Sequence, residues 1–190
     1  QAGNNFTAKN ITVQANSTPQ LSMDNTNVSA SIVRGAGMIN EVSTKGDTEL
    51  TVAAGSTMKA DKIDLKAQLL TDNTAKHTLK SDIHAVGVSV LGIGVDKSRT
   101  YSTRNVKTDV GYITLSGFTN PDKVSALTIA SFDGTDIDNY IRTTAVGVIA
   151  SESNFAQSKL LNTVTTSVNT GTNTWSGVDT LQITATGNTK

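Results

Sequence analysis

Apolar and polar residues alternate with a period of two in four similar segments of the chain, at residues 8–15, 60–67, 124–131 and 178–185. Each segment has two large aliphatic residues one position apart, followed by a small residue. Such alternation predicts a strand with one buried face. The side chains expected to point into the core are Ile11, Val13, Ile63, Leu65, Leu127, Ile129, Leu181 and Ile183.

The four segments recur at regular intervals together with two other motifs. Their first core positions, from Ile11 to Leu181, are separated by 52, 64 and 54 residues. The tetrapeptide Ala-Val-Gly-Val occurs at residues 85 and 145, and valines at 42, 106 and 164 mark a third segment. These spacings predict one element over 1–190 with internal repeats at about 1–58, 59–121, 122–175 and a partial 176–190.

Short strands at a short period indicate an all-β fold, a parallel β-helix (β-solenoid) with turns of about 20 residues. Three such turns make up each long repeat. About nine or ten turns stacked 4.8 Å apart would give a rod roughly 45 Å long. An antiparallel sandwich is the alternative, and the scarcity of Asn-Gly and Asp-Gly turns counts against it. Residues 152–161 form a candidate short amphipathic helix.

Composition narrows the classes of partner. The net charge is zero, with 16 basic and 16 acidic residues, so neither nucleic acid nor an anionic membrane is suggested. Cysteine is absent, which excludes disulfides and cysteine-ligated metals. The longest apolar run, residues 83–95, is shorter than the roughly 18 residues that span a bilayer, so no membrane insertion is expected. The polar N-terminus shows no signal peptide, and we expect both ends to join further repeats or further copies.

The strand pattern resembles the repeat regions of large secreted bacterial filamentous adhesins, the filamentous haemagglutinin-like and leukotoxin-type filamentous proteins. The resemblance lies in the segments Ile-Thr-Val-Gln-Ala, Ile-Asp-Leu-Lys-Ala and Leu-Gln-Ile-Thr-Ala, and in the two Ala-Val-Gly-Val motifs. It covers nearly the whole chain and is a pattern rather than a signature. It implies a right-handed β-helix stalk, secretion and a surface role, with no catalytic residues.

Few residues form candidate chemical sites. Asp133, Asp136 and Asp138 lie within six residues and could bind calcium, although their spacing fits neither the helix-loop-helix calcium loop nor the nonapeptide calcium-roll repeat. His77 and His84 are a weak candidate zinc pair. The residues that could line a glycan groove are Arg99, Tyr101, Arg104 and Lys107. For each set, an ordinary solvated surface is the simpler interpretation.

Catalysis has one weak candidate. Parallel β-helices include polysaccharide lyases with clustered acids and a basic residue on one face, and Asp61, Asp64 and Lys66 share a strand. The glycines at 87, 92 and 94 lack the spacing of a phosphate loop and indicate close backbone packing inside the coil.

The sequence therefore predicts a non-catalytic, extracellular, cell-surface stalk or fibre segment without cofactors. Its partners would be copies of itself or further repeats, joined through the solenoid ends, with a host or community cell-surface glycan or protein as a further candidate. The alternatives are a subunit of a self-assembling filament, and a glycan-binding or polysaccharide-cleaving β-helix.

Overall fold

The computed structural model describes residues 3–70, 78–169, 171, 173–175 and 177–187, and these residues contain strands and no helix. The strands are β1 (Asn5–Thr7), β2 (Asn10–Ser17), β3 (Leu21–Ala36), β4 (Ile39–Val52), β5 (Ser56–Lys59), β6 (Lys62–Leu69), β7 (Leu79–Val110), β8 (Ile113–Ser116), β9 (Val124–Asp133), β10 (Ile137–Leu160), β11 (Thr163–Val168), β12 (Thr174–Trp175) and β13 (Val178–Gly187).

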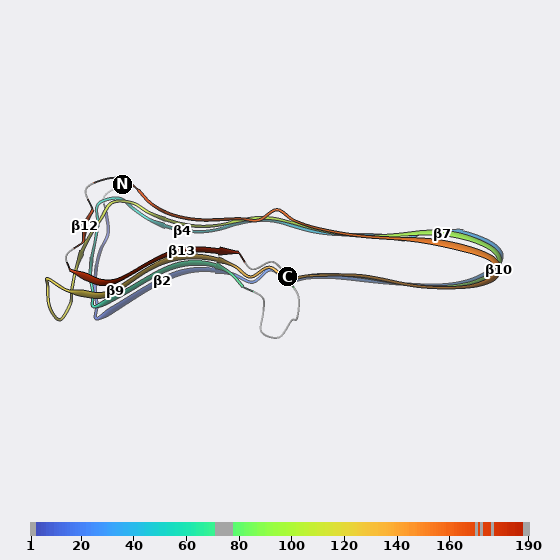
Figure 1. Ribbon diagram of the computed structural model, residues 1–190, viewed down its shortest axis with the longest axis horizontal. Helices are drawn as coiled ribbons and strands as arrows, with labels where there is room; N and C mark the ends of the chain where they lie inside the picture. Colours follow the sequence, from blue (N-terminus) through green and yellow to red (C-terminus); the bar gives the residue numbers. More distant parts are fainter. Residues whose placement is uncertain (1–2, 71–77, 170, 172, 176, 188–190) are drawn as a thin grey trace.

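These strands form three parallel sheets that the chain visits in turn (Figure 1). The corner sheet contains β1, β5, β8 and β12, and the template sheet contains β2, β6, β9 and β13. The long sheet has β7 in its middle layer, with β3 and β4 on one side and β10 and β11 on the other. The corner and template sheets therefore have four layers and the long sheet three. This arrangement confirms the predicted all-β, parallel β-solenoid class.

The length of one coil differs from the expectation. Leu21, Leu79 and Ile137 are neighbours in successive layers of the long sheet, so one coil there takes 58 residues rather than about 20. The three segments of each long repeat, which sequence spacing alone assigned to three turns, are three sides of a single coil. Four layers at 4.8 Å spacing give a stack only about 15 Å thick. The strands, not the stacking direction, run along the longest dimension (Figure 1).

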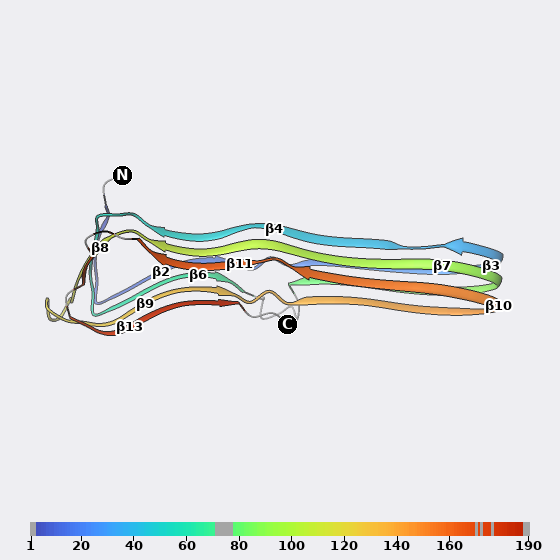
Figure 2. The ribbon, with the colours of Figure 1, turned by 45° about the horizontal axis from the view of Figure 1, so that its top comes forward.

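The long sheet folds back on itself and makes a narrow arm (Figure 2). Each layer turns at one residue, namely Ile32, Val90 or Val148, where the pairing register skips a position. We call residues 21–47, 79–105 and 137–163 the arm. The strand segments before and after each turning residue are its two legs, and the end that contains the three turning residues is the tip. The base consists of the corner and template sheets with residues 48–52, 106–110 and 164–168 of the long sheet.

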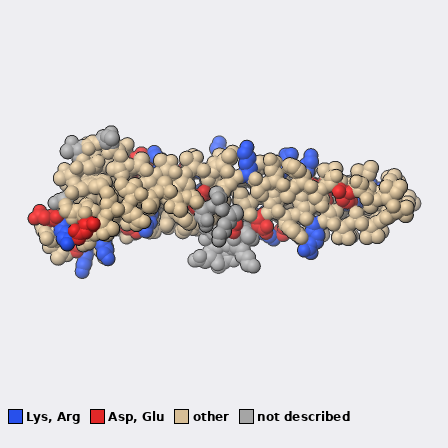
Figure 3. Space-filling view, viewed as in Figure 1, with Lys and Arg blue, Asp and Glu red and all other residues tan. Residues whose placement is uncertain are grey.

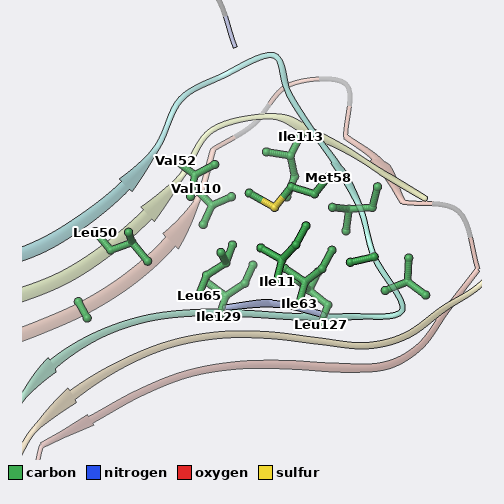
Figure 4. Close-up of a cluster of buried hydrophobic side chains, with 14 of the residues drawn as sticks. Ile11, Leu50, Val52, Met58, Ile63, Leu65, Val110, Ile113, Leu127 and Ile129 are labelled. Carbon is green, nitrogen blue, oxygen red and sulfur yellow. The ribbon is translucent and has the colours of Figure 1, made fainter. Parts of the chain in front are cut away.

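The base holds the hydrophobic core (Figure 4). Ile63, Leu65, Leu127 and Ile129 of the template sheet are at most 1% exposed and face Val110 and its neighbours. Burying each such side chain stabilises the fold by about 1.5–3 kcal/mol. The predicted core residue Ile11 is also buried, and Val13 is half-buried against the same cluster.

Two core predictions are wrong. Leu181 and Ile183 are 49% and 44% exposed. They pair in register with Leu127 and Ile129, but they belong to the outermost layer of the template sheet. The strand phase was therefore right, and the burial fails because no further layer covers them.

The prediction of a short helix at 152–161 is also wrong. Nearly all of it belongs to β10, where Phe155 pairs with Lys97 of β7. Ser158 lies between the two legs of the arm and its hydroxyl shares a hydrogen bond of 3.1 Å with Thr100. Alternate residues of this segment therefore point to opposite faces of a strand, whereas the predicted helix would have placed residues three or four apart on the same face.

Candidate functional site

The interior of the arm is largely polar, with Leu79 and Ile83 of β7 as buried apolar exceptions. The hydroxyls of Ser81 and Ser98, on facing legs, share a hydrogen bond of 2.6 Å. Asn40 Nδ2 donates to the carbonyl of Asp82 at 2.9 Å, and Asn139 Nδ2 donates to the carbonyl of Gln157 at 2.9 Å. Short polar side chains let the two legs approach closely, and their mutual bonds satisfy groups that would be costly to bury alone.

A buried polar cluster lies where the arm meets the base. Asn162 Oδ1 accepts from the Ser102 hydroxyl at 2.8 Å and from the Arg104 backbone N–H at 2.9 Å. Arg104 itself is 8% exposed and its guanidinium donates to Thr44 and Ser17. The glycan-groove prediction for Arg104 is therefore wrong, because its position in β7 points the side chain into the coil.

The candidate calcium residues do not gather into a site. Asp133 is 2% exposed, and its carboxylate accepts hydrogen bonds from the backbone N–H and hydroxyl of Thr135 and from Asn162 Nδ2. These are donors, whereas a cation needs oxygen acceptors. Within the described ranges no group of three His, Cys, Asp or Glu residues could hold a metal ion. His84 lies half-buried on the arm, and His77 falls outside the described residues.

The other glycan candidates share one outer face of β7. Tyr101 donates its hydroxyl to Gln157 Oε1 at 3.2 Å, and Arg99 lies 4.0 Å from Glu41. Lys107 Nζ lies 3.0 Å from Asp109 Oδ2 and 3.5 Å from Glu49 Oε1. Except for the Lys107–Asp109 pair, which lies within β7, these contacts join neighbouring layers, so they stabilise the stack.

This ladder of contacts also shifts two pKa values. The hydrogen bond from Lys107, and then that from Ser167, holds the pKa of Asp109 below its usual value. The hydrogen bond to Asp109, and then its charge, raises the pKa of Lys107. Beside the pair lies a shallow hollow of about 230 Å³, lined by Asp47, Glu49, Asn105, Val106, Lys107, Thr163 and Thr165. Its charged groups are already paired, so it offers no free cation for an acidic sugar.

The candidate lyase residues have structural contacts of their own. Asp61 accepts from the backbone N–H groups of Phe118 and Thr119 at 3.0 and 2.8 Å, and these bonds tie down the loop before β9. The pKa of Asp61 is lowered chiefly by the hydrogen bonds from Thr119. Asp64 forms an ion pair of 2.7 Å with Lys66 along the same strand. Asp64 borders an open hollow of about 320 Å³ on the template sheet, together with Thr12, Lys62 and Thr128, and its ion pair with Lys66 already uses its charge.

The backbone edges of the outer strands carry N–H and C=O groups that are not used in strand pairing. β2, β3 and β4 pair only with β6 and β7, and β10, β11 and β13 pair only with β7 and β9, within the described part of the chain. Each therefore offers one row of N–H and C=O groups to a further strand. Open edges were predicted for the ends of the solenoid, and in the structure they run along the whole arm.

One buried ion pair was missed by sequence reasoning. Arg34 Nη1 lies 2.7 Å from Glu152 Oε1, with side chains 5% and 10% exposed, although the two residues belong to the first and third layers. Between them the middle layer carries glycines: a Cβ on Gly87 would lie 1.7 Å from Arg34 Nη1, and one on Gly94 would lie 1.9 Å from Glu152 Oε2. The glycines at 87, 92 and 94 were predicted to allow close backbone packing; in the structure they instead make room for the side chains of Arg34, Ser89 and Glu152. The pairing itself was detectable only with the 58-residue register in hand.

Comparison with known proteins adds no further constraint. No family model, curated protein or solved structure matches the chain. Among the described residues, no helix has the length and apolar character needed to cross a bilayer.

Proposed function

We propose that the chain is a non-catalytic structural segment of a secreted, surface-exposed filamentous adhesin, and that it extends end to end by strand pairing. The observation that carries this proposal is the pair of open edges on the outer layers, β2–β4 on one side and β10, β11 and β13 on the other. A parallel edge of this length is a template for more of the same strand. Head-to-tail addition does not close on itself and gives a filament.

The side chains at these edges suit stacking. In the template sheet, continued register would place Gln182 of β13 beside Thr12 of the next unit, since Thr12, Asp64, Thr128 and Gln182 occupy equivalent positions. Because the long sheet has one layer fewer, this junction leaves a one-layer gap between β10 and β3 of the next unit, which a further layer of the long sheet must fill. Neither Gln182 nor Thr12 carries a charge that would repel the other. Apolar residues also meet, because Leu181 and Ile183 would gain Ile11 and Val13 as neighbours and lose the exposure described above.

A charge-matched pair of variants tests the junction. Thr12→Lys with Gln182→Lys places like charges opposite one another only at the contact between units. Thr12→Lys with Gln182→Glu places opposite charges there and serves as the control. We expect the first variant to remain small in light scattering at low salt and to assemble when salt screens the charges. The control should form filaments by electron microscopy at either salt.

The outcome that contradicts the proposal is equally direct. A wild-type chain that stays monomeric at high concentration, with backbone amides of β2 and β13 protected from hydrogen exchange, has capped edges and is no fibre segment. Turnover of a polysaccharide that is lost on replacing Asp61 or Asp64, with the fold intact, would favour the polysaccharide-cleaving alternative instead.

A further inference from the structure

At the tip of the arm the apolar side chains point outward and the small polar residues and glycines point inward, which is the opposite of the base. In the middle layer, Gly87, Ser89, Gly92 and Gly94 point inward and are buried, while the apolar residues between them point out. The outer layers continue the apolar surface. The exposed apolar residues, between 38% and 82% exposed, are Val28, Ile32, Val33, Val86, Val88, Val90, Leu91, Ile93, Val95, Val146, Val148 and Ile149.

This exposure is built into the arm. The inward space of the tip is filled by the Arg34–Glu152 ion pair, which crosses the middle layer at glycine positions. A strand that slipped by one residue would place valines where a Cβ already collides with Arg34 or Glu152. The apolar side chains therefore have no interior to enter, and they stay on the surface.

The apolar surface covers both faces of the arm and its turn. The exposed fractions of these twelve residues correspond to roughly 1,000 Å² in all, or about 500 Å² on each face, which is at the upper end of the 300–600 Å² of the largest patch on an ordinary monomer. Figure 3 shows few charged side chains at this end of the molecule, whereas Lys, Arg, Asp and Glu are spread over the rest. A surface of this size indicates an apolar partner.

The shape of the patch distinguishes between partners. The residues are divided among two opposite faces of the arm and its turn, so a second flat copy would cover less than half of them. That is about 500 Å² or less, below the roughly 800 Å² per partner of a stable protein interface. Fluid acyl chains cover a convex wedge on all sides at once.

The depth and the charges at the end of the patch fit one lipid leaflet. The first charged outward side chains are Arg142, six residues before Val148, and Lys97, seven residues after Val90. The uncharged tip is thus about 20 Å deep, against about 15 Å for half of the hydrocarbon core of a bilayer. Tyr140, whose ring lies 5.6 Å from the Arg142 guanidinium, follows at the same level. Tyrosines and cations are the side chains that favour the headgroup region.

We propose that the tip inserts into one leaflet of a phospholipid bilayer, with Lys97 and Arg142 at the phosphates. The inference rests on the proposed function in one respect. The open edges of β3 and β10 reach the tip, and unpaired backbone groups do not enter hydrocarbon. Further coils that continue the long sheet on both sides would pair these edges, so the inserting form is a stack in which the long sheet continues as well as the template sheet.

Vesicle flotation tests the proposal on the full chain, after electron microscopy has established whether stacks are present. The vesicles are phosphatidylcholine, with or without phosphatidylglycerol. The test variant carries Ile32→Ser, Val90→Ser and Val148→Ser, which alter exposed turn residues only. The control is Phe118→Ser, which removes a 45% exposed phenyl ring outside the arm. We expect at least a tenfold loss of floated protein for the triple variant and none for the control.

Quenching of tryptophan fluorescence by brominated lipids measures how deeply the tip inserts. Val90→Trp in a Trp175→Phe background should be quenched by lipids brominated on the acyl chain, whereas the native Trp175 of the base should not. Equal flotation of the triple variant and the wild type, or an unquenched Trp at position 90, overturns the insertion. If the triple substitution instead reduces side-by-side bundling of filaments and leaves flotation at zero, the patch binds a second copy and the proposal is wrong.

Failure of the proposed function gives a different result. Absence of stacks under the microscope rejects the fibre segment by itself. An unstacked chain that does not float then rejects the insertion as well. Quenching at position 90 of an unstacked chain would overturn the requirement for paired edges, while keeping the tip as the inserting element.

Discussion

The base and the arm use the same layered strands and fill them in opposite ways. In the base, Leu65, Ile129 and their neighbours form a dry aliphatic interior. In the arm, Ser81, Ser98 and Thr100 occupy the corresponding inward positions and bond to one another or to the next layer. The change of composition within β7 shows that stacked strands accommodate either an aliphatic or a largely polar interior.

The largest effect should come from breaking the ion pair inside the arm. Arg34→Met leaves the carboxylate of Glu152 buried without its partner, which costs about 3–5 kcal/mol. Arg34→Met combined with Glu152→Leu removes both charges and should recover most of that loss. Urea unfolding and hydrogen exchange of the arm amides measure the two variants. Equal losses for the single and the double variant would contradict a buried pair.

A cavity in the base should cost slightly less. Leu65→Ala removes a fully buried side chain and should destabilise the fold by about 2–5 kcal/mol. Asp64→Ala, one residue away on the outer face, should change stability by no more than about 0.5 kcal/mol. Chemical denaturation of both variants compares the two faces of one strand, and similar losses would reject the assigned strand phase.

A single hydroxyl of the arm interior should matter less than an aliphatic side chain of the base. Ser98→Ala leaves the Ser81 hydroxyl buried without its partner, which costs about 1–3 kcal/mol. The double variant Ser81→Ala with Ser98→Ala leaves neither hydroxyl and should lose no more than the single one. Thermal unfolding distinguishes this from a purely additive loss, which would mean that the hydroxyls are not bonded to each other.

The smallest expected effect is a change in the pH dependence of stability, caused by Asp109 on the outer face near the junction of arm and base. Because the pKa of Asp109 is lowered from 3.8 in the folded chain, the ionised carboxylate favours folding. This contribution is complete above the ordinary pKa and is lost as the pH falls through the lower, folded pKa. For such a partly exposed pair it amounts to about 1 kcal/mol or less. Asp109→Asn should flatten the acid limb of the stability curve, and Asp122→Asn in an exposed loop should leave it unchanged.

The sequence predicted the base better than the arm. The template residues from Ile11 to Ile129 were placed correctly because aliphatic residues alternating with polar ones have a single favourable orientation against a hydrophobic core. In the arm, Arg104 was assigned to the outer face, and the structure buries it among Ser17 and Thr44. There the inward row mixes serine, threonine and glycine with a few apolar residues such as Leu79 and Ile83, and its outward row contains valine, so hydrophobicity does not identify the interior.

The coil length could not be read from spacing alone. Segments 20 residues apart are compatible with three short turns or with three sides of one long turn. What separates these possibilities is the partner of each strand, such as Leu79 beside Leu21, and no local property of the residues encodes it. The Arg34–Glu152 pair depends on the same unknown register and was hidden for the same reason.

The unequal layer counts of the sheets, four in the corner and template sheets and three in the long sheet, make the outer surface of the stack a ramp rather than a plane. A crystal with a screw dislocation has the same property: each added layer leaves a new step, so a step for further growth is always present. A strand that arrives above β10 and β11 meets their edge below it and the end of β13 beside it. Growth at such a ledge requires no new layer to be nucleated, and the two ends of the filament remain structurally different throughout.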